Sequence, residues 1–162
     1  MYYLSNFDLA DSSFFMRTPQ STDAQFPPLL RKCWMRLNAL FQKRVGAIGL
    51  TPDQYIALRW LNELPSGTVY QLTLKKLMFT DPNNIAGLMA RMERMGVIER
   101  RADVADRRKK LVFCTSKGKT LFEQARKVAV RLEEETLSIL SESEREEFLG
   151  LLAEINRRLH SE

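Results

Sequence analysis

The sequence predicts a mainly α-helical fold with one small β-hairpin, flanked by helices at both ends of the chain. From residue 26 onward, apolar residues recur mostly at three- and four-residue steps, the period of amphipathic helices. Two β-prone runs, residues 97–101 and 109–114, interrupt this pattern and are separated by a polar loop. Residues 116–162 then return to the helical period.

Composition narrows the class of protein. The chain has 162 residues, 44% hydrophobic and 28% charged, as in globular domains. No apolar run approaches the roughly 20 residues that cross a bilayer, and no secretory pattern opens the chain, so we expect no membrane partner and a cytoplasmic location. Cys33, Cys114 and the single His160 are too few for a disulfide scaffold or zinc site. Nucleotide, hydrolase and metalloprotease motifs are absent, so we expect no metal, no cofactor and no enzyme activity.

Charge is distributed unevenly along the chain. Residues 71–120 hold twelve Lys and Arg against five Asp and Glu, a local net charge of +7, whereas residues 132–162 hold nine acidic residues against three arginines, a net of −6. A basic centre joined to an acidic tail favours a polyanionic partner on one surface. A solvated basic face without a partner is the alternative that charge alone leaves open.

The first part of the chain contains an arm and two helices. Residues 1–25 are polar, carry five aromatic residues without a sustained period, and are expected to dock on another surface. Residues 26–50 contain a helix of about five turns, with Cys33 on its apolar stripe. Thr51 and Pro52 predict the N-cap and first position of a second helix, which ends before residues 65–67.

Residues 71–79 and 82–95 predict two short helices joined by a tight turn. Asp81 is placed to cap the second helix and Pro82 to occupy its first position, while Gly96 ends it. Its apolar stripe is expected from Ile85, Leu88, Met92 and Met95, and its opposite face presents amides first, then small residues and arginines: Asn83, Asn84, Ala86, Gly87, Ala90, Arg91 and Arg94.

This polar face has the chemistry that reading a DNA groove requires. Asn can bond adenine, Arg can pair with guanine or phosphate, small residues permit close approach, and a helix N-terminus favours phosphate. Two short helices with this arrangement predict a helix-turn-helix. An amphipathic helical hairpin with no nucleic-acid partner is the alternative for this segment alone.

The β-prone runs after this helix predict a two-stranded wing with arginines at its tip. Such a tip suits the minor groove of DNA, where negative potential is concentrated. Asp106 lies two positions before Arg108 and is expected to orient its guanidinium through a charge-assisted hydrogen bond. An exposed, soluble hairpin does not account for the cations clustered between residues 103 and 110.

In these segments the sequence resembles the MarR family of winged helix-turn-helix transcription regulators, over about residues 30–160. An Asp-x-Arg at the wing tip, followed by Thr115 and Gly118 at the start of a long helix, looks like the family's wing signature. The matching segments are residues 50–55 with 58–59, 88–93, 96–100, 103–108, 111–112 and 115–118.

Four positions depart from the family pattern. Tyr70, Lys75 and Phe79 stand where the first helix of the helix-turn-helix often has Ser or Thr, a small residue and Gly, and Cys114 replaces Leu before Thr115. The resemblance implies a two-fold dimer whose recognition helices lie one DNA turn apart on a pseudo-palindromic operator. It also implies release from DNA by a small aromatic acid or phenol.

The C-terminal region supplies further helices. A helix of about 25 residues follows Thr115, and Ser141 with Glu144 predicts a capping box that starts the final helix. Wide apolar faces on the first and last helices favour self-association. The expected organisation is an aromatic arm (1–25), a helical dimerisation region (26–50 and 116–162) and a winged helix-turn-helix domain that binds double-stranded DNA (51–115).

The predicted function is a dimeric, sequence-specific transcriptional repressor released by a small ligand. An aromatic wall and a cation for that ligand are expected from Trp34, Tyr55, Arg59 and Trp60, although the two tryptophans could equally be core residues and Arg59 an ion-pair residue. DNA contacts are expected from Lys75, Asn83, Asn84, Ala86, Gly87, Arg91, Arg94, Arg107, Arg108, Lys109 and Lys117, with Asp106 orienting the wing.

Three other functions are left open at this point. A thiol-responsive regulator would use Cys33 or Cys114, although the positions of both favour small core residues. A non-specific architectural nucleic-acid binder would have equal affinity for unrelated duplexes. An enzyme would need a convergent set of titratable groups that the sequence does not display.

Overall fold

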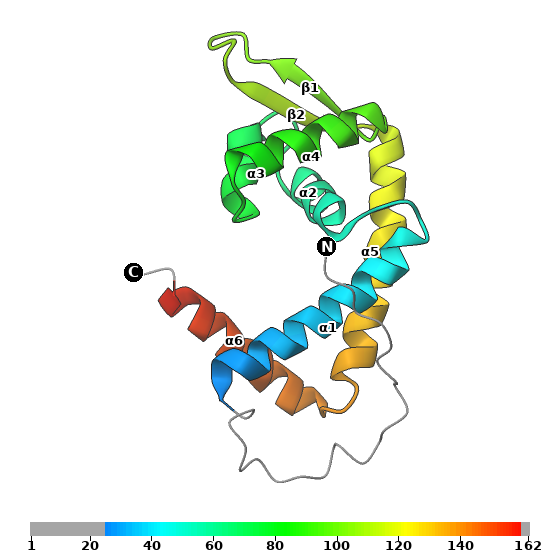
Figure 1. Ribbon diagram of the computed structural model, residues 1–162, viewed down its shortest axis with the longest axis vertical. Coiled ribbons are helices and arrows are strands. Elements are labelled where there is room, and N and C mark those ends of the chain that lie inside the picture. Colours follow the sequence, from blue (N-terminus) through cyan, green and yellow to red (C-terminus); the bar gives the residue numbers. More distant parts are fainter. Residues whose placement is uncertain (1–24, 160–162) are drawn as a thin grey trace, which may run out of the picture. The chain divides into compact units, whose positions relative to one another are not determined.

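The computed structural model describes residues 25–159, so the aromatic arm lies outside the described residues except for Gln25. The described elements are six helices and one two-stranded antiparallel sheet (Figure 1). By their internal contacts, the described residues fall into two units, residues 25–37 and residues 38–159, and the first helix crosses the boundary between them. In order, the elements are α1 (Phe26–Gly46), α2 (Pro52–Glu63), α3 (Gln71–Leu77), α4 (Pro82–Arg94), β1 (Ile98–Ala102), β2 (Lys110–Cys114), α5 (Ser116–Leu137) and α6 (Glu142–Leu159).

The part of α1 in the first unit has an exposed apolar side. Phe26, Leu29, Leu30, Trp34 and Met35 are all exposed, and Val45, near the other end, is the one buried residue of α1. Cys33 is exposed as well, so the expectation that it packs in a core is wrong for the single chain. The apolar stripe was predicted correctly, and its side chains are exposed in this part of α1.

The core of the second unit lies between α2, α3, α4 and the hairpin, which Figure 1 shows grouped together, and it also includes Phe122 and Ala125 of α5. The buried side of α4 contains Ile85, Leu88 and Met92, as expected. Met89 is fully buried too, which widens the predicted stripe, whereas Met95 is only half-buried. The largest fully buried side chains of the chain are Leu58, Leu74, Met89, Met92, Ile98, Val45, Val69, Val97 and Val112.

The helix starts follow the predicted capping chemistry. Thr51 and Gln54 form a reciprocal capping box on α2, with Pro52 at its first position. The Asp81 side chain caps α4, and Thr115 Oγ1 accepts a hydrogen bond from Gly118 N at the start of α5. Ser141 and Glu144 form the expected box at α6.

The hairpin has the predicted position, shifted by one residue. Ile98 pairs with Cys114 at one end of the register, and Ala102 pairs with Lys110 at the other. Val112 N also donates to Val69 O (2.9 Å), and Tyr70 forms an isolated antiparallel bridge with Leu111. The segment before α3 is thereby joined to the outer side of β2. We call residues 51–115, which contain this sheet, the winged lobe.

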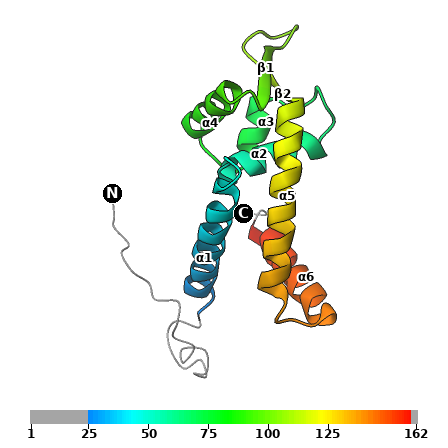
Figure 2. The same cartoon turned by 90° about the vertical axis from the view of Figure 1, so that its right-hand side faces the viewer.

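The two C-terminal helices differ in burial. Gly118, in the first turn of α5, lies so close to β1 that an added Cβ would stand 2.1 Å from the Val97 carbonyl oxygen. Figure 2 shows α5 running from the hairpin to α6. Among its described residues α6 has none that is buried, although its apolar stripe was predicted. In the described part of the chain, no helix is long and apolar enough to cross a membrane.

Two of the family departures have structural consequences at α3. Phe79, in the turn before α4, has φ 50°, a left-handed conformation that glycine adopts most easily, and its side chain is 80% exposed. Tyr70 is at the N-cap position of α3 but makes no side-chain hydrogen bond to that helix. The register of α3 is nevertheless maintained, because Leu74 is fully buried.

Candidate nucleic-acid interface

The outward face of α4 carries the residues predicted to contact DNA. Asn83, Asn84, Ala86, Arg91 and Arg94 are exposed, whereas Gly87 and Ala90 are half-buried. An added Cβ on Gly87 would come within 3.3 Å of Arg91 Nη1, so the glycine leaves room for that guanidinium. The helix therefore presents amides at its start and guanidiniums in its second half, separated by small residues.

The N-terminus of α4 is already occupied by a carboxylate. Asp81 Oδ1 accepts hydrogen bonds from Asn83 N (2.8 Å) and Asn84 N (2.9 Å). The expectation that this helix end attracts a phosphate is therefore wrong, because the two N–H groups are satisfied and the charge beside them is negative.

The two asparagines are not equivalent. Asn84 Nδ2 donates to Asp81 Oδ2, so part of its amide is engaged within the protein. In the described part of the chain, the Asn83 side chain has no hydrogen-bond partner, which leaves its donor and acceptor open. A bidentate contact with adenine requires both groups, so Asn83 is the better candidate of the two.

Asp106 orients cations at the wing tip. Asp106 Oδ1 accepts from the backbone N of Arg108 (3.1 Å) and from its Nε (3.3 Å), and Asp106 Oδ2 forms an ion pair with Lys109 Nζ (3.8 Å). Asp106 holds the guanidinium of Arg108 through its Nε alone. Because the Arg108 side chain is 94% exposed, the other guanidinium donors face solvent. One carboxylate thus orients two cations and leaves the tip positive, with Arg107 also exposed.

The arginines at the base of the wing have structural roles. Arg100 pairs with Glu93 of α4, through Arg100 Nη2 to Glu93 Oε2 (2.5 Å), and its backbone N donates to the same carboxylate (3.1 Å). The Arg100 side chain holds the pKa of Glu93 below its ordinary range. Arg101 pairs with Glu99 and stacks over Phe113, 4.6 Å from the ring centroid. The Arg100–Glu93 contacts join α4 to the sheet, and the Arg101 contacts lie within the sheet.

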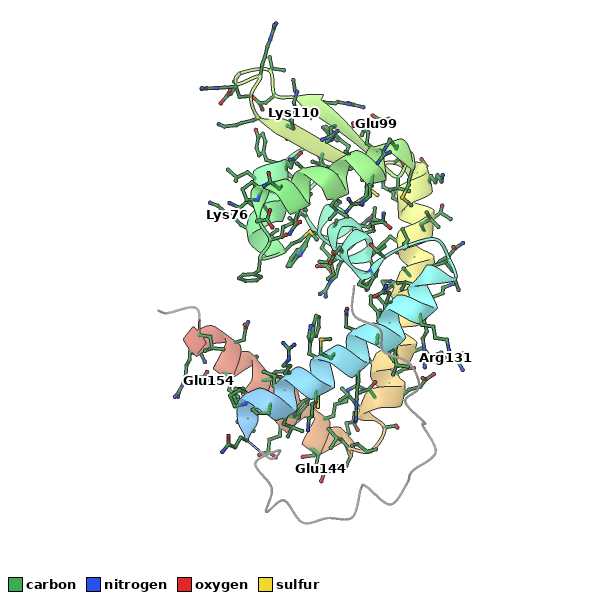
Figure 3. The ribbon with its side chains drawn as sticks, viewed as in Figure 1. Lys76, Glu99, Lys110, Arg131, Glu144 and Glu154 are labelled. Carbon is green, nitrogen blue, oxygen red and sulfur yellow. The ribbon has the colours of Figure 1, made fainter. Side chains whose placement is uncertain are left out.

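A basic hollow of about 600 Å³ lies between α3, the start of α4 and the wing. Its lining contains no acidic side chain, which suits a stretch of phosphate backbone. The prediction included Lys75 and the wing residues but omitted Lys76 and Lys110, although both belong to the basic segment. Figure 3 labels these two residues on α3 and at the start of β2. The charged residues of the lining are Lys75, Lys76, Arg108, Lys109 and Lys110.

Lys117 has a partner inside the protein. Its Nζ donates to the Met95 carbonyl oxygen (2.8 Å), and Thr115 Oγ1 donates to the neighbouring Gly96 carbonyl oxygen (2.8 Å). Both groups satisfy carbonyls at the C-terminal end of α4, where a cation is favourable. The position gives Lys117 a structural contact in addition to its expected role at DNA.

The candidate ligand residues of the second unit lie on α2. Tyr55 packs edge-to-face on Phe41 (5.2 Å between centroids) and stacks on Phe122 (5.9 Å), and burial raises its pKa. Arg59 Nε pairs with Glu63 Oε1 (2.7 Å), and its guanidinium carbon lies 5.9 Å from the Trp60 ring centroid. Trp34, in the first unit, is 57% exposed and is not a core residue of the single chain.

Arg59 is therefore an ion-pair residue, as the alternative interpretation held. The Glu63 carboxylate raises the pKa of Arg59 and neutralises the cation that was to attract a ligand carboxylate. Trp60 is half-buried against the core. An aromatic surface remains in place, but a ligand anion would compete with Glu63.

The second cysteine behaves as a core residue. Burial raises the pKa of the Cys114 thiol, and Asn62 Nδ2 lies 3.6 Å from its sulfur. A thiol with a raised pKa is a poor nucleophile near neutral pH.

Comparisons with known proteins show which family the chain belongs to. The MarR family model matches residues 50–110. The transcriptional regulator HosA of Escherichia coli is 30% identical over 129 residues, which cover 76% of this chain and 94% of HosA. The HTH-type transcriptional repressor NicR of Pseudomonas putida is 30% identical over 135 residues, 83% of this chain and 84% of NicR.

A solved structure of Bordetella bronchiseptica BpsR is also similar. The two structures superpose with a TM-score of 0.71 at 28% sequence identity, and the match covers 79% of this chain and 96% of BpsR. The BpsR structure describes how 6-hydroxynicotinic acid regulates DNA binding by BpsR. The fold, the wing signature and these similarities agree. The chain belongs to the MarR family and is a transcriptional regulator.

Proposed function

We propose that this regulator acts in the cytoplasm as a homodimer that binds a pseudo-palindromic operator, represses transcription and is released by a small aromatic acid or phenol. The observation that supports it most is the surface formed by α4, the basic hollow and the wing. It combines the open amide of Asn83, the guanidinium of Arg91 and a hollow lined by five cations and no acid. Amides supply base readout and cations supply backbone affinity.

The dimer is supported by the apolar residues that one chain leaves exposed. On α6 these follow the helical period and include Phe148, Leu151, Leu152 and Ile155, with Leu151 59% exposed. An exposed apolar side is also present on the first part of α1, around Leu30 and Trp34. Two-fold pairing would bury such faces and place two recognition helices on one duplex.

Repression and ligand release are supported by what the similar proteins do. NicR is named a repressor, and BpsR responds to 6-hydroxynicotinic acid, a small aromatic acid. In this chain Tyr55 and Trp60, both on α2, offer aromatic surface for such a ligand. Arg59 would bind the carboxylate of such a ligand only if that carboxylate displaced Glu63 from its ion pair with Arg59.

Selection of duplexes from a random-sequence library by the full chain tests DNA binding directly. Fluorescence anisotropy with the selected duplex should show Arg108→Ala weakened at least about tenfold, with a smaller salt dependence, because a minor-groove cation is lost. The exposed Lys127→Ala on α5 removes one cation outside the interface and should bind like wild type. Full affinity of Arg108→Ala would contradict the proposed role of the wing.

Sequence preference is tested at the two asparagines. Asn83→Ala should change the selected sequence, at a cost of about 1–3 kcal/mol on the preferred base, and Asn84→Ala should change it less, because the Asn84 amide is partly engaged. Equal affinity of the wild-type chain for unrelated duplexes at physiological salt would instead identify a non-specific binder.

A further inference from the structure

Tyr70 makes an unexpected contact at the start of α3. At an N-cap position a short polar side chain normally accepts a hydrogen bond from the first turn of its own helix. Tyr70 makes no such bond, and its hydroxyl instead donates to Asp103 Oδ2 at 2.8 Å, 33 residues further along the chain. The contact joins the first helix of the helix-turn-helix to the first residue of the wing loop.

Asp103 in turn organises the wing loop. Its other carboxylate oxygen, Oδ1, accepts from Ala105 N (2.8 Å) and Asp106 N (2.9 Å). Asp103 N donates to Lys109 O (3.1 Å), and Lys109 N donates to Asp106 O (2.8 Å). The carboxylate that Tyr70 contacts therefore sets the position of Asp106.

Asp106 is the residue that orients the exposed cations of the tip. A continuous series of hydrogen bonds leads from Tyr70 Oη through the Asp103 carboxylate and the Asp106 backbone to Arg108 Nε. The accepted bonds from Asp106 N and Tyr70 lower the pKa of Asp103, so the carboxylate stays ionised at neutral pH.

The base of the wing is anchored separately. The backbone bond from Val112 N to Val69 O and the bridge between Tyr70 and Leu111 fix the outer side of β2 without any side chain. The Arg100–Glu93 pair fixes β1 to α4. Tyr70 Oη adds a contact at the loop, where no backbone pairing with α2 or α3 is present among the described residues.

We propose that Tyr70 is a positioning residue that holds the wing tip at a fixed place relative to the helix-turn-helix, so that Arg107 and Arg108 enter the minor groove while α4 is in the major groove. The inference rests on the proposed DNA binding. It assigns a role to the residue that departs from the family pattern at this helix start. A loop that is held before binding loses less conformational entropy on DNA.

Tyr70→Phe tests the proposal because it removes the hydroxyl and keeps the ring. With the duplex selected by the wild-type chain, its affinity should fall about fivefold, since a charge-assisted bond that orders the tip is lost. Amide exchange at residues 105 and 106 of the free protein should accelerate. Thr120→Val, which removes a hydroxyl bonded to Ser116 O on α5, is the matched control and should change neither measurement.

The decisive comparison uses a background without the two tip arginines. In Arg107→Ala/Arg108→Ala protein, the added Tyr70→Phe change should cost less than twofold, because the arginines proposed to enter the minor groove are absent. Asp103→Ala should reproduce the loss of Tyr70→Phe and be non-additive with it. A fivefold loss that persists in the double-alanine background would overturn the proposal, as would affinity within twofold of wild type for Tyr70→Phe.

If the chain does not bind DNA, the experiments give a result that differs from failure of the Tyr70 proposal. If the wild-type chain selects no duplex, DNA binding is refuted, and the amide-exchange measurement still decides whether Tyr70 holds the loop. Unchanged exchange at residues 105 and 106 in Tyr70→Phe would overturn the inference whatever the DNA result.

Discussion

The winged lobe and helix α6 bury their apolar residues to very different extents. In the winged lobe Leu58, Met89 and Val112 are essentially inaccessible, whereas α6 has an equally regular apolar stripe and no buried residue among those described. The charge also differs, since residues 71–120 carry a net +7 and residues 132–162 a net −6. Figure 3 labels Glu144 and Glu154 on α6 and Lys76 and Lys110 in the winged lobe.

The sequence therefore contains two kinds of apolar stripe, one that is buried when the chain folds and one that stays exposed. In the winged lobe the stripes of α2 and α4 meet other stripes of the same chain, so folding alone buries them. On α6 the stripe is complete but uncovered, which is the property expected of an interface that a second chain covers. The following changes test whether the two regions differ in this way.

The largest effect is expected from two glycines, Gly118 on α5, which packs against the winged lobe, and Gly150 on α6. Gly118→Ala should destabilise the fold by about 3 kcal/mol, because the new Cβ would lie 2.1 Å from the Val97 carbonyl and α5 would have to shift. Gly150→Ala on α6 meets nothing within 4 Å and should be neutral or stabilising by up to about 1 kcal/mol, as expected for Ala in a helix. Urea unfolding of both variants measures the difference, and equal effects would remove the distinction.

The next effect concerns association. Leu151→Glu places a charge on the exposed stripe of α6 and should convert a dimer to a monomer, as measured by light scattering. Operator affinity should then fall about 100-fold, since one recognition helix must bind alone. Circular dichroism should remain that of the folded winged lobe. A monomeric wild-type protein would show that the stripe is not a dimer interface.

A smaller effect is expected in the turn before α4. Phe79→Gly should raise the free energy of unfolding by up to about 1 kcal/mol, because φ 50° is unfavourable for a side chain with a Cβ and free for glycine. Phe79→Ala keeps the unfavourable backbone and serves as the control. Thermal melting that places Phe79→Gly below Phe79→Ala would contradict the prediction, because both variants lack the ring and only glycine relieves the positive φ.

The smallest effect concerns pH. Arg100 lowers the pKa of Glu93 in the folded protein, so the ion pair contributes stability above the carboxyl's ordinary pKa and loses it as the pH falls through the lowered value. Wild type should therefore be more stable than Glu93→Gln at neutral pH, and the difference should shrink below about pH 4. Denaturant midpoints at several pH values measure it. A difference that stays constant down to pH 3 would contradict a role for the carboxylate charge.

The helix starts and the amphipathic stripes could be predicted from the sequence because each depends on a few neighbouring residues. Thr51 with Gln54, Asp81 with Pro82, and Ser141 with Glu144 carry their capping chemistry within four positions. The Asp106–Arg108 contact is equally local. The hairpin was placed to within one residue by its β-prone runs and polar loop.

Contacts between distant segments could not be predicted in the same way. Tyr70 and Asp103, Lys117 and Met95, and Gly118 and Val97 meet only after α3, α4, the sheet and α5 have packed, and no local pattern pairs them. The exposure of Cys33 was missed for a related reason, because an apolar stripe does not show what covers it. The Asp81 cap of α4 and the Arg59–Glu63 ion pair, in contrast, are local contacts within four positions. Periodicity and capping are encoded over one or two helical turns, whereas the partner of a side chain depends on which segments the whole fold brings together.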